Sequence, residues 1–419
     1  MRLPAVSILA LGLSGCGGGD LIDPFPVSID LSSGAAMLTV SAGLEGERIP
    51  AVLDTMSPIT IIDGFVPGEP VPSPRRRQTD LAVYADAIPR AEFLGVSAFE
   101  IHPCPDGTAY CELGLGESRA QFRAIVGADV MSRGALRFNL PASTVTFFPD
   151  IAGDDEARGR ACAAVFPSPF SGGGTLTLGG SEVEFSSSRI ALGACLHYDV
   201  ASSSSGADVL MVLSSGISVS VLSESAYERY RQRVGDAGMA PALADLPPGQ
   251  VHLPSGTVAA RMGTITRAAL VGEGSDERGP CQEVYANHVL SVDGCRDPSS
   301  PVRPCPCADD DTFCSTAATV ELDRAFPVAV ISDLDPLLQA LRNELRPRYP
   351  EVDGILGLGA LAPTSVDVDY RNSRVLFRCE DRSQCTARPE VRSESTLPEI
   401  AACLAGPGDP VTAPAGARP

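Results

Sequence analysis

The sequence predicts an all-β chain built from two duplicated, barrel-like lobes with few short helices. Gly and Pro are abundant, at 41 and 36 of 419 residues, and Val, Ser and Thr recur in short alternating runs that are typical of strands. One pattern of strand, small polar loop and strand occurs twice, and the chain is long enough to bury the core of more than one domain. Together these observations favour two β-rich lobes over a helical protein.

The repeated pattern indicates an internal duplication. Residues 52–62 read VLDTMSPITII, and residues 212–222 read VLSSGISVSVL. Each copy is followed later by an aliphatic pair and a Gly, in AIVGADV and GILGLGA, and then by a strand that ends in Val-x-Phe. Three elements in the same order in both halves are best explained by a repeat of one structural unit.

The repeat divides the chain into segments. We expect a signal peptide over 1–15, a lipidated Cys with a flexible tether over 16–27, a first lobe over 28–165 and a second lobe over 166–380. A Cys-rich insert interrupts the second lobe at about 272–315, and a tail follows over 381–419.

One helix is predicted within the second lobe. Asp335 fits the N-cap, Pro336 the first helical position and Pro347 the stop. Four leucines fall on one face of the helix, which we therefore expect to pack on the lobe: Leu337, Leu338, Leu341 and Leu345.

The first residues, MRLPAVSILALGLSGC, predict export. One Arg precedes a short apolar run that is too short for a stable membrane span. The end of this run resembles the lipobox of bacterial lipoproteins, in which Cys16 would be acylated and anchor the chain to a bilayer. No Asp follows Cys16, so the resemblance implies an outer-membrane lipoprotein. The alternative is an ordinary signal peptide with an incidental Cys.

The remaining cysteines agree with an oxidising compartment. The chain has 13 Cys, so 13 − 1 = 12 remain beyond Cys16, and an even number in an exported chain predicts disulfides. Cys104 with Cys111 and Cys379 with Cys385 are close enough in sequence to pair, and the pairing of the others stays open. Zinc at the cluster around residues 281–314 is disfavoured, because the spacings do not match zinc fingers.

Charge excludes one class of partner. Asp and Glu number 52 against 32 Lys and Arg, a net charge of −20, which opposes binding to nucleic acid. The Arg75-Arg76-Arg77 cluster is interpreted as a solvated loop, with contact to anionic lipid or polysaccharide as the alternative. The Asp309-Asp310-Asp311 run lacks the spacing of a calcium loop. No cofactor or metal is predicted, and we expect a monomer.

From Val27 to Phe377 the chain resembles the pepsin-like aspartic peptidases, with a first lobe that is also similar to retropepsins. The resemblance is carried by the Asp54 loop, Ile125-Val126-Gly127, the Ser214 loop and Ile355-Leu356-Gly357, in that order. It implies a bilobal all-β fold in which each lobe contributes one Asp-Thr/Ser-Gly loop. In the family the two aspartates share one proton, and together they activate a water and protonate the scissile carbonyl oxygen.

The first loop matches this motif at most positions. Asp54 and Thr55 match its first two residues, and Ser57 matches a residue that commonly follows. Met56 stands where the family has Gly, a residue that lets the backbone approach the acids without a Cβ. We therefore expect the Met56 side chain to crowd the water or a bound peptide.

The second loop departs from the motif at its acid. Ser214 occupies the position of the second Asp, whereas Ser215, Gly216 and the supporting Gly127 and Gly357 match. A hydroxyl does not titrate at ambient pH, so the shared proton is lost and activity is predicted to be impaired or absent. Asp208 and Glu224 are the acids nearest in sequence that could substitute for it.

Other routes to catalysis are weaker. Only four His are present and none lies in a recognisable nucleophile motif, so a serine hydrolase is disfavoured. Tyr84 is the nearest candidate for the tyrosine that pepsin-like proteins carry on a flap, although an ordinary strand Tyr is the preferred interpretation.

Three functions remain. The first is a catalytically silent envelope lipoprotein that binds an extended peptide or a partner protein between its lobes, for example by strand addition. The second is an active aspartic endopeptidase with an unorthodox dyad. The third is a structural envelope lipoprotein without a functional cleft.

Overall fold

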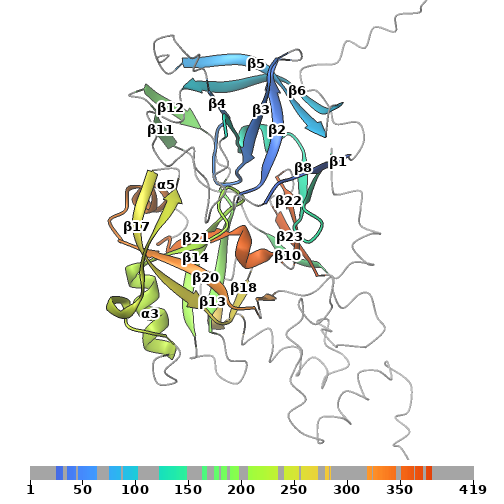
Figure 1. Cartoon of the computed structure of the whole chain (residues 1–419). Helices are drawn as coiled ribbons and strands as arrows, with labels where there is room; N and C mark the ends of the chain where they lie inside the picture. The colour runs from blue at the N-terminus through green and yellow to red at the C-terminus, as the bar shows by residue number, and fades with distance from the viewer. Residues whose placement is uncertain are drawn as a thin grey trace, which may run out of the picture.

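The computed structural model confirms an all-β chain with two lobes and few short helices (Figure 1). It describes residues 25–31, 35–43, 46–63, 75–85, 88–101, 122–148, 163–167, 174–178, 181–185, 189–197, 206–234, 240–253, 256–271, 279–282, 284, 319–322, 324–345, 351–362, 364–370 and 374–379.

The first lobe is a closed six-stranded barrel. Its strands follow the order β2 (Met37–Ala42), β3 (Arg48–Leu53), β7 (Ala124–Val126), β4 (Ile61–Asp63), β6 (Ile88–Ile101) and β5 (Arg75–Ala85). β5 and β6 form a long hairpin, and β2 pairs with β5 to close the barrel.

The second lobe is built on a nine-stranded sheet. Its order is β16 (Pro248–Leu253), β17 (Gly256–Ile265), β20 (Phe326–Ile331), β15 (Ser220–Ser223), β21 (Gly354–Gly357), β14 (Ala207–Ser214), β13 (Ala191–Leu196), β18 (Ala268–Val271) and β19 (Thr319–Leu322). A separate hairpin, β11 (Gly174–Leu178) with β12 (Ser181–Phe185), precedes this sheet in the chain.

A third, six-stranded sheet joins the two halves. It runs β1 (Phe25–Ser28), β9 (Thr144–Phe148), β8 (Ala135–Asn139), β22 (Thr364–Asp369), β23 (Arg374–Cys379) and β10 (Ala163–Pro167). The expected lobe boundary at 165/166 therefore falls inside β10. The antiparallel pair of β8 with β22 joins a strand of the first half to a strand of the second half, across a sequence separation of 230 residues at Arg137 and Asp367.

The pairing of the strands repeats between the lobes and confirms the internal duplication. In the first lobe β3 runs parallel to β7, β4 runs antiparallel to β7, and β4 runs parallel to β6. In the second lobe β14, β21, β15 and β20 have the same relations. In both lobes, therefore, the first strand ends at a loop that crosses to the other side of its parallel partner.

The helices are short and few among the described residues. They are α1 (Ala128–Met131), α3 (Glu224–Val234) and α5 (Pro336–Leu345), with the 3-10 turns η4 (Leu243–Asp245) and η6 (Leu358–Leu361). The predicted helix is confirmed as α5: Asp335 Oδ1 accepts hydrogen bonds from the N–H groups of Leu337 (2.9 Å) and Leu338 (3.3 Å), as an N-cap does. Leu338, Leu341 and Leu345 are buried on its inner face.

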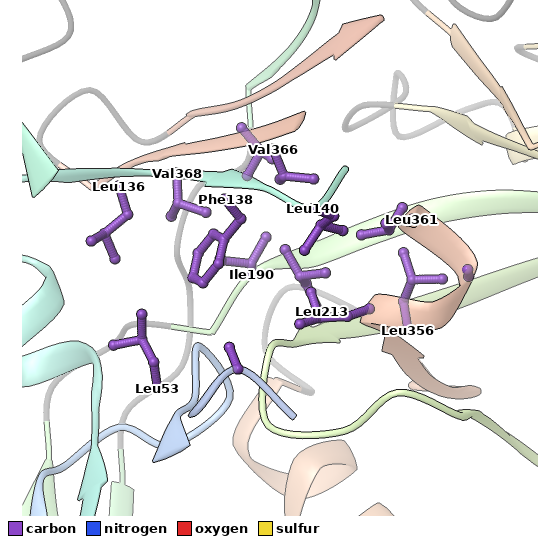
Figure 2. Close-up of a cluster of buried hydrophobic side chains, with 14 of the residues drawn as sticks. Leu53, Leu136, Phe138, Leu140, Ile190, Leu213, Leu356, Leu361, Val366 and Val368 are labelled. Atoms are coloured by element: carbon purple, nitrogen blue, oxygen red, sulfur yellow. The ribbon is translucent and has the colours of Figure 1, made fainter. Parts of the chain in front are cut away.

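The largest hydrophobic cluster lies between the lobes and the shared sheet. Figure 2 shows Leu53 and Leu213, the residues directly before the two predicted loops, in one cluster with Phe138 and Val366 of the shared sheet. This packing fixes the ends of β3 and β14 relative to each other, because both strands end in a close-packed core.

Each lobe also has a smaller cluster of its own. The first-lobe cluster consists of Ala35, Met37, Val52, Ile59, Ile61, Phe99, Phe122 and Ile125. The second-lobe cluster lies around the inner face of α5 and consists of Met56, Val212, Ile217, Val219, Val221, Val251, Leu253, Ala260, Ala329, Ile331, Leu338, Leu341, Leu345, Val352 and Ile355.

Candidate functional site

The two predicted loops meet at the junction of the lobes. β3 ends one residue before Asp54, whose N–H donates to Val126 O of the parallel strand β7 at 3.1 Å. β14 ends at Ser214, which pairs in register with Gly357 of β21. Asp54 and Ser214 thus occupy equivalent positions in the two lobes.

The glycines that follow the aliphatic pairs are equivalent as well. Gly127 N donates to Thr60 Oγ1 at 3.1 Å, and Gly357 N donates to Ser220 Oγ at 3.1 Å. A Cβ on Gly127 would lie 2.3 Å from Ile59 O, so only Gly fits where this strand passes the loop. Both predicted glycines therefore support the loop of their own lobe.

Reciprocal hydrogen bonds hold the two loops together. Thr55 Oγ1 donates to Leu213 O at 3.0 Å, and Ser215 Oγ donates to Leu53 O at 2.6 Å. Each hydroxyl also accepts from the backbone N–H of the other residue, Thr55 N at 3.0 Å and Ser215 N at 3.1 Å. This exchange leaves little freedom for one loop to shift against the other, because each bond joins residues from different lobes.

The carboxylate of Asp54 faces the hydroxyl of Ser214. Ser214 Oγ donates to Asp54 Oδ1 at 2.8 Å, and the N–H groups of Met56 (2.9 Å) and Gly216 (3.3 Å) donate to the same oxygen. The described residues direct no hydrogen bond to Oδ2. Asp54 is 4% exposed, so the site has a buried carboxylate in which one oxygen accepts three hydrogen bonds and the other accepts none from the described residues.

Burial raises the pKa of Asp54 above its ordinary value, and four groups oppose this rise. They are the Met56 N–H, the Ser214 hydroxyl, the positive charge of Arg189 and the Gly216 N–H. Within the described part of the chain, none of the hydrogen bonds to Asp54 comes from another carboxyl group. The arrangement therefore provides one titratable acid, without a second carboxylate to share its proton.

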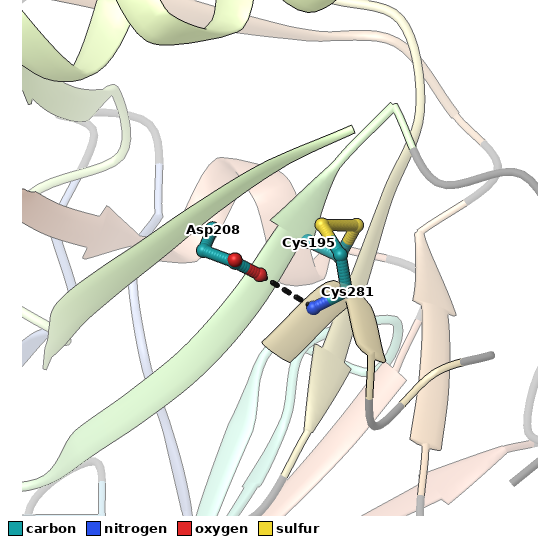
Figure 3. The surroundings of a disulfide bond; sticks show 3 residues. All are labelled: Cys195, Asp208 and Cys281. Atoms are coloured by element: carbon teal, nitrogen blue, oxygen red, sulfur yellow. Dashed lines mark hydrogen bonds between the residues drawn. A yellow bond between two sulfur atoms is a disulfide. The ribbon is translucent and has the colours of Figure 1, made fainter. Parts of the chain in front are cut away.

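The two acids considered as replacements lie elsewhere. Figure 3 shows Asp208 beside the disulfide of Cys195 with Cys281, where its Oδ1 accepts from Cys281 N at 2.6 Å. Glu224 is exposed at the start of α3. The disulfide also supports the preference for oxidised cysteines over zinc at this part of the chain.

The expectation that the Met56 side chain crowds the acid is wrong. The side chain is 1% exposed and belongs to the second-lobe cluster, so it crosses the junction and packs among the apolar residues of that cluster. At the equivalent position of the other loop Gly is required, because a Cβ on Gly216 would lie 2.7 Å from Asp54 Cγ. The two loops are therefore not interchangeable.

Tyr84, the flap candidate, is a buried strand residue of the first-lobe barrel. Its hydroxyl accepts a hydrogen bond from Ser41 Oγ at 3.2 Å, and the guanidinium of Arg48 lies 4.7 Å from its ring centre. These contacts favour the interpretation as an ordinary strand Tyr. Ser57 stays within its own loop, where its hydroxyl donates to Ile59 O at 2.8 Å.

Sequence reasoning did not single out Arg189 or Tyr370. Arg189 is buried and pairs with Glu344 of α5. Burial raises the pKa of Tyr370, and the negative charges of Asp54 and Asp129 raise it further. No sequence motif marks either residue, although an Arg two residues before a buried strand is a weak signal for a paired charge.

Several predictions fall on residues that the structure does not describe. They are Cys16, the Cys104–Cys111 and Cys379–Cys385 pairs as whole pairs, and Asp309-Asp310-Asp311. Within the described ranges, no group of three or more His, Cys, Asp or Glu could hold a metal ion. The described helices include none with the length and apolar character needed to cross a membrane.

No protein-family model matches the chain, and no curated protein matches it either. Among solved structures it is similar to the aspartic proteinase from Irpex lacteus, with a TM-score of 0.38 and 12% sequence identity. The match covers 87% of this chain and 99% of that chain.

Proposed function

We propose that this chain is an aspartic-peptidase-like protein of the cell envelope that no longer cleaves peptides. The observation that carries the proposal is the 2.8 Å hydrogen bond from Ser214 Oγ to Asp54 Oδ1, at the position equivalent to Asp54 in the other lobe. A hydroxyl there donates a hydrogen bond but does not titrate at ambient pH, so it cannot serve as the second acid or base. General acid–base catalysis by a pair therefore lacks one member, and each member typically contributes about 10²–10⁴ in rate.

Binding is the function that such a site retains. Three donors from the described residues converge on Oδ1, which leaves Oδ2 as an acceptor for a ligand hydroxyl or amide N–H. An extended peptide supplies such donors along its backbone. We therefore propose a peptide or protein segment as the ligand, bound with Asp54 as its central acceptor.

Peptide-library digestion from about pH 3 to pH 8 tests the loss of catalysis. The wild type and Asp54→Ala are compared after circular dichroism has shown that both are folded. We expect the same background for both proteins. Cleavage by the wild type that disappears in Asp54→Ala would establish an active endopeptidase with an unorthodox dyad and would refute the proposal.

Binding is tested separately with a peptide-like inhibitor that carries a central hydroxyl in place of the scissile bond. Calorimetric titration of the wild type should show binding that Asp54→Asn weakens by about tenfold, a loss typical of one buried hydrogen bond to a charged group. Equal affinity in both proteins, or no binding to the wild type, would favour the structural envelope protein.

Lipid anchoring is a proposal from the N-terminal sequence alone. If Cys16 is acylated, a labelled fatty acid should be incorporated into the wild type and not into Cys16→Ala, and only the wild type should fractionate with outer membranes. Incorporation of label into both proteins would exclude Cys16 as the acylated residue.

A further inference from the structure

Besides Asp54 and Ser214, the lobes differ in charge at a second pair of equivalent positions. Leu53 N donates to Ala36 O at 2.8 Å, and Leu213 N donates to Ile190 O at 2.9 Å, so Ala36 and Ile190 are equivalent. The residues before them are therefore equivalent too: Ala35 in the first lobe, and Arg189 in the second. Ala35 lies in the first-lobe cluster, which makes the Arg a charge placed where the other lobe has a buried methyl group.

Arg189 forms a buried ion pair with helix α5. Its Nε donates to both carboxylate oxygens of Glu344, at 3.0 and 3.2 Å, and its Nη2 donates to Oε2 at 3.1 Å. The side chains are only 6% and 7% exposed. A pair this buried is costly to desolvate unless its geometry is good, and three hydrogen bonds meet that requirement.

Arg189 also contacts the β12 strand. Its guanidinium carbon lies 5.7 Å from the ring centre of Phe185, within the range of a cation–π contact. Phe185 itself packs against the first-lobe cluster, and Arg76 of β5 donates to Glu184 O at 3.1 Å. In Figure 1, β12 and α5 lie on the same side of the molecule, on the left.

These contacts form a continuous series that connects the two lobes. The first-lobe barrel holds β12 through Phe185 and Arg76, and α5 of the second lobe holds Glu344. The guanidinium of Arg189 joins the two, since it contacts Phe185 and Glu344 at once. The positive charge also acts on Asp54, where it lowers the pKa that burial raises.

We propose that Arg189 fixes the two lobes against each other beside Asp54, through Glu344 of α5 on one side and Phe185 of β12 on the other, and thereby limits access to the Asp54 carboxylate. The reciprocal hydrogen bonds of Thr55 and Ser215 hold the two loops together. The Arg189–Glu344 pair provides a second connection between the lobes. Loss of the pair frees β12 from the second lobe, so the junction opens more often while the chain stays folded.

Carbodiimide-promoted coupling of glycine ethyl ester to carboxyl groups, read by mass spectrometry, tests access to Asp54. The variants are Glu344→Gln, which keeps shape but removes the charge, and Phe185→Leu, which keeps apolar volume but removes the ring. Both should raise the labelling rate of Asp54 by about tenfold. Hydrogen exchange of the Met56 and Gly216 N–H groups should rise with it, because both groups donate to Asp54.

The matched control is Arg137→Met. Arg137 makes a two-bond pair with Asp367, at 2.8 and 3.0 Å, within the shared sheet and away from β12 and α5. This variant should lose stability and leave Asp54 labelling within about twofold of the wild type. The proposal fails if Glu344→Gln and Phe185→Leu change the labelling no more than Arg137→Met does, after correction for global stability. It also fails if labelling rises at carboxyl groups throughout the chain.

Discussion

Replacing Ser214 by Asp should make the stability of this protein strongly dependent on pH. The hydroxyl of Ser214 lies 2.8 Å from Asp54 Oδ1 and accepts a hydrogen bond from Gly216 N at 3.1 Å. A carboxylate in this place can still accept the hydrogen bond from Gly216 N, so the variant is expected to fold. It also sets a second acid against Asp54, at a distance at which two negative charges repel strongly.

The expected size of the repulsion follows from the distance between the carboxylates of residues 54 and 214. With charge centres about 4 Å apart and an effective dielectric constant of about 20, the repulsion is about 4 kcal/mol. This corresponds to about 3 pKa units, so the pair should keep one proton up to about pH 7 in the folded state. In the unfolded chain both acids titrate near their ordinary values.

The sign of the effect follows from proton binding. Between about pH 4 and pH 7 the folded variant binds more protons than the unfolded chain, so its free energy of unfolding falls as the pH rises. The raised pKa stabilises the fold below the ordinary value, and this contribution is lost as the pH passes the raised value. About 4 kcal/mol should disappear between about pH 4 and pH 8.

Urea denaturation across this pH range measures the effect, with Ser214→Asn as the matched control. The Asn side chain has the same shape and no charge, so the difference between the two curves isolates the repulsion. Parallel curves for the two variants would show that residue 214 does not face Asp54, and would refute the geometry on which the proposed function depends.

Further predictions concern the same junction and the helix beside it. Gly216→Ala should lose at least about 1–3 kcal/mol in urea denaturation, because its Cβ would meet Asp54 Cγ at 2.7 Å; a loss below about 0.5 kcal/mol would contradict the close approach. Met56→Ala should lose about 2–5 kcal/mol in the same assay, because it empties a site in the second-lobe cluster. Asp335→Ala should lower the melting temperature through the loss of about 0.5–2 kcal/mol of N-cap energy. Asp54→Asn should flatten the fall in stability above the ordinary pKa of 3.8, since burial raises the Asp54 pKa and the proton is released at higher pH; an unchanged pH profile would contradict the burial.

The fold and the meeting of the two loops could be predicted from the sequence because the same set of motifs occurs twice in the same order. Short alternating strands run into small polar loops twice, and each loop has its own supporting Gly, Gly127 and Gly357. Helix α5 was predictable for another reason, since an N-cap acid and a following Pro specify its start. These helix signals are neighbours in the chain, whereas Gly127 and Gly357 lie far from the loops that they support and were recognisable because the same motif recurs in both halves.

The rest of the site depends on contacts between distant residues. Arg189 and Glu344 are 155 residues apart, and neither lies in a pattern that points to the other. Met56 breaks the rule that this position needs Gly, because the rule considers the backbone approach and not the apolar contacts that the second lobe offers. The disulfide of Cys195 with Cys281 spans 86 residues, and spacing alone does not select it among the possible pairs.

The shared six-stranded sheet sets a condition on how the chain reaches its native state. Arg137 of β8 contacts Asp367 of β22 across a sequence separation of 230 residues. During synthesis the first lobe therefore emerges long before the strand that covers one edge of β8, and an uncovered edge is a site for pairing with other chains. Contacts of such long range also slow the search for the native topology. Chains shortened before residue 364 should consequently aggregate rather than yield a free first lobe, and the full-length chain should refold slowly after dilution from urea.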